Sequence, residues 1–586
     1  MTRFCNATSL GLALLGLAAC GAAPAPAPPQ APTAPHENLA RIVERYWDER
    51  PPSGKPLSPQ YLADSLAVQR RFLAEVLAVP RSGLNAEAGL TYDIFKRQRE
   101  LDIEGFTYPS ELMPVNPFAG MPVQLPLEAA GFGEHPLGNA ADYEYWGAEM
   151  DAFPAWTRQA IANMRDGMRR GYTFSRVLVE RMLPELQDLG SDSSSNVFYK
   201  ALRNMPPAIK EPERTQLASK LNAEIREKLL PAYRELHDFI QNDYLPRART
   251  SIALSALPLG QSWYAYRVRR ATDSALTPGE IYGIGTAEVE RIRARLLLLP
   301  AGTPPPGASA NAGAGVAANA GGTTGGATGA AVGSVALLNA YQELKAQVAA
   351  AIPMLFSAIP QSDFDIRAVG ADGAALPMPF YQSAAPDGRT AAILYVNTAS
   401  GASGSANLDT EGFLREAMPG RHFQTALQQE RADLPKFRRY GTDPAFVDGW
   451  ALYAASLGEE LSLYHDDEAK RGELWGEMKC AVALVVDTGL QAKDWTRARA
   501  VEYLRQQLTI DAAAAEAMAD RYVAQPGDAL ACTMGELKIQ ALRTRAQQVL
   551  GARFDIRGFH SEILKDGAMP LDILEAKMKL WLDAQR

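Results

Sequence analysis

The sequence contains few of the residues that build metal centres and disulfide frameworks. Its 586 residues include only six histidines and four cysteines. Four cysteines exclude a disulfide-rich scaffold, and we expect Cys480 and Cys532, the two outside the N-terminal segment, to be free thiols. Six histidines leave few candidates for a histidine-based metal or acid–base site. With 59 Lys and Arg against 67 Asp and Glu, nothing in the composition indicates nucleic acid as a partner.

The N-terminal segment has the pattern of a secretion signal. A short apolar stretch, Leu10–Leu17, leads to small residues before Cys20. The stretch is too short to span a bilayer core of about 30 Å. It predicts a bacterial lipoprotein signal peptide over residues 1–19, with Cys20 lipidated and inserted into the lipid bilayer; an ordinary signal peptide cleaved near Ala22 is the alternative. Gly21, in place of an inner-membrane retention Asp, favours the outer membrane, facing either the periplasm or the surface.

Three further regions differ in composition. Residues 20–38 alternate Ala with Pro and predict an extended tether. Residues 39–586 predict a single, mostly helical domain. Within it, residues 300–334 predict a disordered loop, because Ala and Gly supply 21 of residues 301–334 and cannot offset the entropy of ordering. The helical pattern resumes at Val335; a hinge between two domains is the alternative.

Hydrophobic periodicity predicts a mainly α fold with one small β-sheet. Apolar residues recur at helical spacing most clearly over residues 143–170, 175–189, 211–242 and 277–298. The last of these opens with a capping box, Thr277 and Glu280 around a proline. Alternating strand patterns occur only between residues 364 and 398, at 364–367, 379–382 and 392–396.

Two segments carry the strongest functional signal. Residues 415–424 read Arg-Glu-Ala-Met-Pro-Gly-Arg-His-Phe-Gln, and residues 446–454 read Phe-Val-Asp-Gly-Trp-Ala-Leu-Tyr-Ala. They resemble the bacterial secreted and lipoprotein family known as domain-of-unknown-function family eight-eight-five. Its pattern is His-Glu-Ala-x-Pro-Gly-His-His-x-Gln followed by Val-Glu-Gly-Trp-Ala-x-Tyr. Shorter matches extend the resemblance from about residue 40 to the C-terminus, apart from the Ala/Gly-rich loop.

The resemblance implies a large helical body similar to carboxypeptidase-like gluzincin metallopeptidases. It implies a deep cleft beside the small sheet, with zinc held by two His and a Glu. The general-base Glu is retained as Glu416, and the second His of the pair is retained as His422. The leading His is Arg415, the first His of the pair is Arg421, and the downstream Glu is Asp448.

Other positions of the resemblance concern the substrate. It places Arg389, Tyr395 and Asn397 near the cleft as candidate substrate contacts. A family Tyr that could bind or polarise substrate is replaced here by Cys532, and a family His is replaced by Tyr282.

These replacements change what the site can hold. Arginine stays protonated and offers only hydrogen-bond donors, so it cannot ligate a metal. Asp448 is shorter than Glu by about 1.5 Å, whereas a zinc ligand tolerates deviations of about 0.2 Å. Zn²⁺ with two neutral His carries the same charge as Arg415 and Arg421 together. We therefore expect the two guanidinium groups to replace the metal and to pair with Glu416 and Asp448.

Two functions remain open at this level. The first is a cell-envelope lipoprotein with a catalytically degenerate metallopeptidase-like fold and no cofactor, which binds a peptide or an envelope protein. The second is an active zinc peptidase in which Glu416 is the general base and His422 and Asp448 ligate the metal. Structural roles are the simpler interpretation of the same residues: His422 as a core histidine, and Glu416 as a partner of the neighbouring arginines.

Overall fold

The computed structural model describes most of the chain beyond the N-terminal segment. The described residues are 35–51, 57–132, 137–300, 327–369, 379–386, 388, 390–397 and 408–586. The predicted signal peptide, Cys20, nearly all of the tether and Arg389 lie outside them, as do residues 301–326 of the predicted loop. None of the described helices is long and apolar enough to cross a membrane.

The described chain is mainly helical, as predicted. Its first half contains α1 (Pro35–Glu49), α2 (Pro59–Leu77), α3 (Ala86–Gly105), α4 (Met121–Ala129), α5 (Ala140–Arg170), α6 (Arg176–Leu189), α7 (Val197–Arg203), α8 (Glu213–Glu224), α9 (Leu230–Phe239), α10 (Gly260–Thr272) and α11 (Pro278–Leu297). The predicted capping box opens α11, since the Glu280 N–H donates to Thr277 Oγ1 at 3.3 Å and the Thr277 N–H donates to Glu280 Oε2 at 2.7 Å. The helix predicted over 211–242 is α8 and α9 joined by a π-helical turn.

The second half supplies the helices that surround the candidate site. They are α13 (Ala327–Ala351), α14 (Thr410–Glu416), α15 (Arg421–Glu430), α16 (Lys436–Arg439), α17 (Pro444–Ser456), α18 (Asp467–Ala492), α19 (Arg497–Leu508), α20 (Ala512–Ala524), α21 (Ala531–Leu550), α22 (Ile556–Leu564) and α23 (Leu571–Ala584). α13 begins inside the predicted loop, at Ala327 rather than Val335. Alanine has the highest helix propensity, so an Ala-rich segment next to an amphipathic helix extends that helix.

The small sheet has three strands, β1 (Phe364–Val369), β2 (Phe380–Gln382) and β3 (Ala392–Asn397), in the order β1-β3-β2. β1 runs parallel to β3 and β2 runs antiparallel to it. Successive side chains of β3 point to opposite faces: Leu394 packs into a large core with α14, α15 and α17, whereas Tyr395 packs against Phe132. The sheet therefore presents one face to the helices that carry the charged motif.

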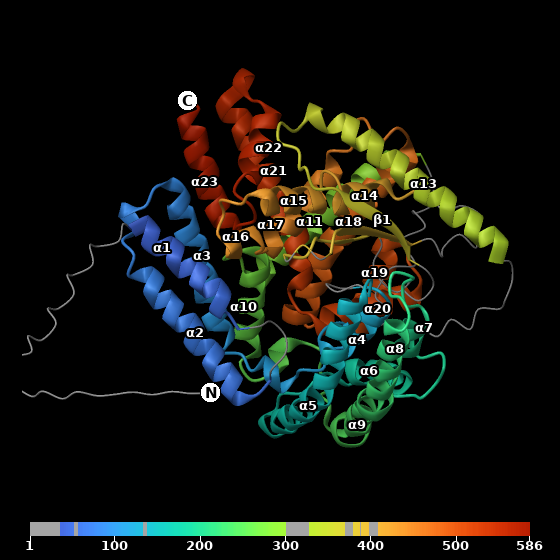
Figure 1. Ribbon diagram of the computed structural model, residues 1–586. Helices are drawn as coiled ribbons and strands as arrows, with labels where there is room; N and C mark the ends of the chain where they lie inside the picture. Colours follow the sequence, from blue (N-terminus) through green and yellow to red (C-terminus); the bar gives the residue numbers. More distant parts are fainter. Residues whose placement is uncertain are drawn as a thin grey trace, which may run out of the picture.

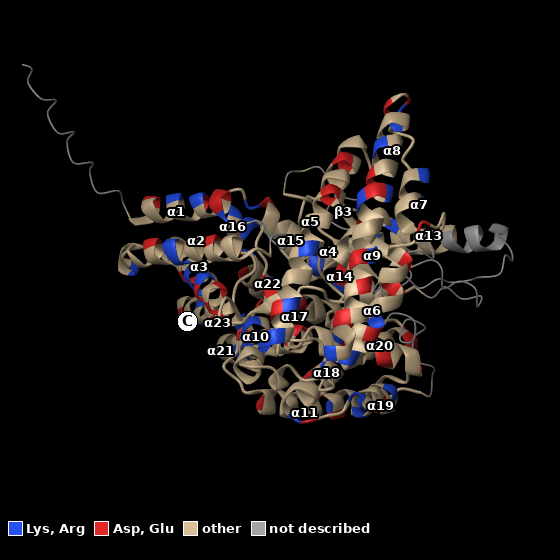
Figure 2. Cartoon of the chain, turned by 90° about the horizontal axis from the view of Figure 1, so that it is seen from below, with Lys and Arg blue, Asp and Glu red and all other residues tan. Residues whose placement is uncertain are grey.

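Two large apolar cores stabilise the body. One is built around α5, α6, α9 and α18, and the other joins α1–α3, the sheet, α14–α17 and α21–α23. In Figure 1 the first three helices and the C-terminal helices lie on the same side of the molecule, although they are at opposite ends of the sequence. Figure 2 shows basic and acidic residues interspersed along the same helices, in agreement with the balanced composition.

Candidate functional site

A tight turn brings the two ends of the charged motif together. α14 ends at Glu416 and α15 begins at Arg421. Between them, a Cβ atom at Gly420 would lie 2.0 Å from the carbonyl oxygen of Arg415, so only glycine fits. The indole N–H of Trp450 on α17 donates to the Pro419 carbonyl at 3.0 Å. The turn is thus fixed to the helix that also carries Asp448.

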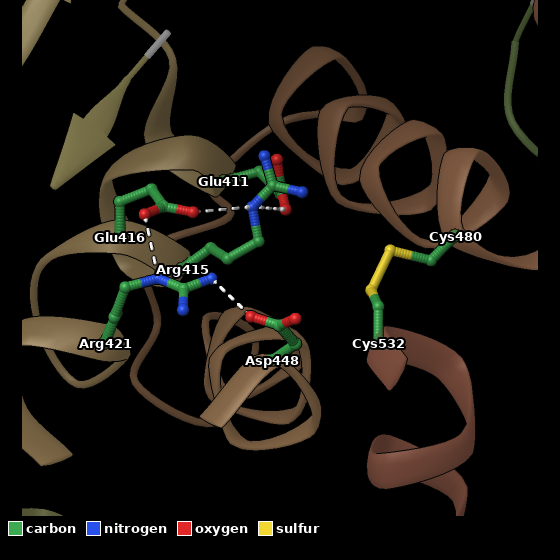
Figure 3. Close-up of a disulfide and its surroundings, with 7 residues drawn as sticks. All are labelled: Glu411, Arg415, Glu416, Arg421, Asp448, Cys480 and Cys532. Atoms are coloured by element: carbon green, nitrogen blue, oxygen red, sulfur yellow. Dashed lines mark hydrogen bonds and ion pairs between the residues drawn. A yellow bond between two sulfur atoms is a disulfide. The ribbon is translucent and has the colours of Figure 1, made fainter. Parts of the chain in front are cut away.

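Five side chains form a connected ionic network, which we call the charged centre: Glu411, Arg415, Glu416, Arg421 and Asp448 (Figure 3). Arg421 donates from Nε to Glu416 Oε2 at 3.1 Å and from Nη2 to Asp448 Oδ1 at 2.8 Å. Arg415 Nε lies 3.7 Å from Glu416 Oε1 and 3.5 Å from Glu411 Oε1. One guanidinium therefore joins the carboxylates of α14 and α17.

The surroundings keep both guanidinium groups charged. Burial acts to lower the pKa of Arg421, but Glu416 and Asp448 outweigh it and hold that pKa above its ordinary value. Glu411 acts in the same way on Arg415 and raises its pKa. Burial raises the pKa of Glu411 itself to about 7, although Arg415 opposes the shift. The charged centre is consequently a set of opposed ions, three carboxylates and two guanidinium groups, and burial favours the protonated form of Glu411.

His422 lies outside this network, in an apolar pocket. Its side chain is only 1% exposed, and its ring lies 4.6 Å from the ring of Phe364. Nε2 is 3.1 Å from the Ser362 carbonyl, which can only accept, so Nε2 carries the proton and Nδ1 accepts from the Tyr381 hydroxyl at 3.1 Å. Burial lowers the pKa of His422 to about 4, so the ring is neutral at pH 7.

The residues at this place do not fit the zinc site that the resemblance implies. Arg415 and Arg421 offer donors only, and the free lone pair of His422 is used by Tyr381. Asp448 is already bonded to Arg421. Within the part of the chain that the structure describes, no three His, Cys, Asp or Glu side chains gather in a way that could hold a metal ion.

Cys480 and Cys532 form a disulfide, so the prediction of two free thiols is wrong. The bond joins α18 to the first turn of α21, with the two Cα atoms 6.0 Å apart. Figure 3 places it beside Asp448, at the edge of the charged centre. The sequence could not reveal the pairing because 52 residues separate the cysteines, and only the packing of α18 against α21 brings them together.

Of the other predicted substrate contacts, Tyr395 lies away from the charged centre. Tyr395 points to the opposite face of the sheet, where its hydroxyl donates to the Gly131 carbonyl at 3.3 Å. Asn397 is the last residue of β3 and pairs in register with Val369. Arg389 lies outside the described residues.

A cavity of about 200 Å³ lies beside the charged centre and the sheet. Arg421 lines it together with residues that sequence reasoning missed, chiefly Gln424, Arg439 and Tyr440. For Gln424 the sequence carried a signal, because Gln424 and Gln428 are polar residues on the inner face of α15. A larger cavity of about 810 Å³ lies elsewhere, where Trp495 and Arg497 of the α18–α19 region meet α6.

Comparison with known proteins identifies the family of the chain. The family described as bacterial protein of unknown function, DUF885, matches residues 53–578. The chain belongs to this family. A solved structure of a candidate lipoprotein from Colwellia psychrerythraea is similar, with a TM-score of 0.77 and 22% identity over 94% of this chain and 98% of that one.

A second solved structure has a lower similarity to this member of the family. It is a candidate lipoprotein of unknown function from Shewanella oneidensis, with a TM-score of 0.59 and 14% identity over 94% of this chain and 98% of that one. No curated protein matches the sequence. At these identities the two structures establish a shared fold.

Proposed function

We propose that the protein is a lipid-anchored binding protein of the bacterial cell envelope, in which an arginine replaces the metal of a metallopeptidase-like site. The observation that carries the proposal is the position of Arg421, whose guanidinium donates to Glu416 and to Asp448 at 3.1 and 2.8 Å. Those are the carboxylates that the family resemblance assigns to the general base and to a metal ligand.

The energetics of buried charge support this interpretation. Two carboxylates at one partly buried site repel each other, and a cation between them relieves that repulsion. Arg421 supplies that cation through two charge-assisted hydrogen bonds, and its fork-shaped donors suit carboxylates. Arg415 and Arg421 together offset the two negative charges of Glu416 and Asp448 without a metal. The site also lacks the ligands that would hold a metal and activate a water molecule.

The anchor is supported by separate observations. Cys20 follows a short apolar stretch and small residues, and an Ala/Pro-rich segment suited to a tether follows it. The two similar structures are both described as candidate lipoproteins. Gly21, in place of an inner-membrane retention Asp, favours a position at the outer membrane. Metabolic labelling with palmitate, lost in the Cys20→Ser variant, is the expected result.

Metal content tests the proposed replacement directly. Protein purified without chelators should contain far less than one zinc per chain. A variant with the two His and the Glu of the family pattern, Arg415→His with Arg421→His and Asp448→Glu, has the metal ligands that the pattern implies. It should bind about one zinc per chain. Arg421→Lys is the matched control, because it changes the same residue without adding a ligand.

Near-stoichiometric zinc in the unmodified protein would contradict the proposal. Peptide hydrolysis that is abolished both by a chelator and by Glu416→Gln would then establish the alternative, a zinc peptidase with Glu416 as its base.

A further inference from the structure

The cavity beside the charged centre has an unusual balance of charge. We call it the Arg439 cavity; its lining includes Tyr381, Arg421, Gln424, Thr425, Gln428, Arg439, Tyr440 and Thr442. Two guanidinium groups line it, and its lining includes no Asp or Glu. At about 200 Å³ it has room for roughly six water molecules of ~30 Å³ each, or for one small organic group.

One wall of the cavity is a polar face of α15. Arg421, Gln424, Thr425 and Gln428 line it at positions i, i+3, i+4 and i+7 of the helix. Gln428 is only 4% exposed, and its side chain is fully engaged: Nε2 donates to the Gly441 carbonyl at 2.7 Å, and Oε1 accepts from the Ala568 N–H at 2.8 Å. These bonds hold the segment that follows α16 against α15, so the cavity is preorganised.

Arg439 supplies the charge that remains unbalanced. Its Nε donates to the Gln429 carbonyl at 2.5 Å, and its guanidinium carbon lies 5.2 Å from the centre of the Tyr440 ring. Among the described residues, no carboxylate forms an ion pair with it. Arg421 is different, because Glu416 and Asp448 already neutralise it. Among the described residues, the lining therefore offers one cation without an acidic partner, and neither Nη nitrogen of Arg439 donates a hydrogen bond.

We propose that the Arg439 cavity binds the free carboxylate of a small ligand, such as the C-terminal end of a peptide. A carboxylate matches both the fork of a guanidinium and the single unbalanced charge. A phosphate carries more negative charge than the cavity can neutralise. Tyr440 and Thr442 belong to the same lining, and each carries a hydroxyl group that can donate a hydrogen bond. The inference rests on the proposed binding function and specifies its ligand chemistry.

The test compares acids with amides. A panel of tripeptides that differ in their last residue is titrated into the full chain by calorimetry, each with a free and with an amidated C-terminus. 1,10-Phenanthroline removes metal during the titration, since EDTA would itself present carboxylates to the cavity. At least one free acid should bind ten-fold or more tightly than its amide, and inorganic phosphate at equal ionic strength should bind more weakly than that acid.

Variants assign the effect to Arg439. Arg439→Gln should weaken binding of the preferred acid at least ten-fold, and Arg439→Lys should retain part of it, because the charge remains but the fork is lost. Lys436→Gln is the matched control: it removes a cation three residues away that points to Glu44 and Asp48, outside the cavity. The affinity of the Lys436→Gln variant for the preferred acid should equal that of the parent protein. The acid–amide comparison uses the unmodified chain and so does not depend on the folding of any variant.

Three results would overturn the inference: equal affinity for every acid and its amide, phosphate binding more tightly than every acid, or unchanged affinity in Arg439→Gln. Failure of the proposed function has a separate signature, namely stoichiometric zinc and cleaved peptides in the absence of phenanthroline. If the proposed function fails in this way, the carboxylate-binding inference would still stand, provided that Arg439-dependent binding is observed in the presence of phenanthroline.

Discussion

The charged centre and the pocket of His422 begin at adjacent residues and have opposite physical character. Arg421 points into a network of ions, where its guanidinium bonds to two carboxylates. His422 points into a pocket formed by Ser362, Phe364 and Tyr381, where it is neutral and 1% exposed. Consecutive residues of a helix project about 100° apart, so one turn of α15 faces both environments.

The difference shows that a residue can match the family pattern without belonging to the ionic network, and can belong to the network without matching the pattern. His422 matches the family pattern, yet its contacts are those of a core residue. Arg415 and Arg421 depart from the pattern, yet they form the ionic network with Glu416 and Asp448. The experiments that follow either abolish this contrast or measure it.

The largest loss of unfolding free energy should follow removal of the Cys480–Cys532 disulfide, which has no counterpart beside His422 among the described residues. Cys480→Ser with Cys532→Ser removes a link across 52 residues of sequence, and the chain-entropy model assigns such a link about 4 kcal/mol of unfolding free energy. Urea denaturation of the double variant should show this loss. The parent protein, reduced and alkylated, is the control and should behave alike. A loss below about 1 kcal/mol would mean that the disulfide constrains little.

The next largest effect concerns pH on the charged side. Burial raises the pKa of Glu411 to about 7 from an ordinary value of 4.5. The folded protein therefore binds a proton that the unfolded chain releases between those values, so this group lowers stability as pH rises from about 4.5 to 7. At 1.36 kcal/mol per pH unit the change is roughly 3 kcal/mol.

Glu411→Gln should remove that dependence. Relative to the parent, the variant should gain stability steadily from pH 4.5 to pH 7.5 in urea denaturation. The surface pair of Glu575 and Lys538 provides the control, because Glu575→Gln removes a carboxylate that is 49% exposed. A Glu411→Gln variant whose stability follows the parent curve at every pH would contradict the assignment.

Removal of the central guanidinium should have a slightly smaller effect. Arg421→Met leaves Glu416 and Asp448 without their shared cation. Fully buried pairs cost about 3–5 kcal/mol to break. Because Arg421 is 27% and Asp448 34% exposed, solvent screens the pair, and we expect a loss of about 2–3 kcal/mol.

A double-mutant cycle separates this interaction from other effects of the substitution. Arg421→Met and Asp448→Asn should be strongly coupled, and the loss in the double variant should be less than the sum of the single losses. Arg421→Lys keeps the charge and should lose less than Arg421→Met. Additive losses would show that Arg421 and Asp448 do not stabilise each other.

Much of the fold could be predicted from sequence, because it depends on local pattern. The helices of residues 143–170 and 277–298, the capping box at Thr277 and the three strands all follow from periodicity and end signals that neighbouring residues carry. The start of α13 was missed because Ala-rich sequence has both high helix propensity and the composition of a flexible segment.

The site was less accessible to sequence reasoning, because it depends on packing between distant segments. Strand alternation implies that Leu394 and Tyr395 face opposite sides, but not which side meets α15. The cysteine pairing depends on the contact of α18 with α21. Arg439 and Arg421 line one cavity because hydrogen bonds hold α16 and the chain after it against α15, from Gln428 to the Gly441 carbonyl and from Arg439 to the Gln429 carbonyl.

The smallest effect should come from the apolar side. His422→Phe keeps the ring beside Phe364 but leaves the Tyr381 hydroxyl and the Ser362 carbonyl without this partner, at a cost of about 1–2 kcal/mol at pH 7. Zinc content should not change, and the preferred peptide acid should still bind through Arg439, because His422 is bonded to no member of the charged centre and does not itself line the Arg439 cavity. A change in either would return His422 to the functional site.

The pH dependence of this loss has the opposite sign from that of Glu411. Burial lowers the pKa of His422 to about 4, whereas the unfolded chain protonates near 6.5. The stabilising contribution of the neutral ring is complete above pH 6.5 and is lost as pH falls toward 4. The deficit of His422→Phe relative to the parent should therefore narrow between pH 7 and pH 5 in urea denaturation. A constant deficit would mean that His422 titrates normally and that the two neighbouring environments differ less than their contacts indicate.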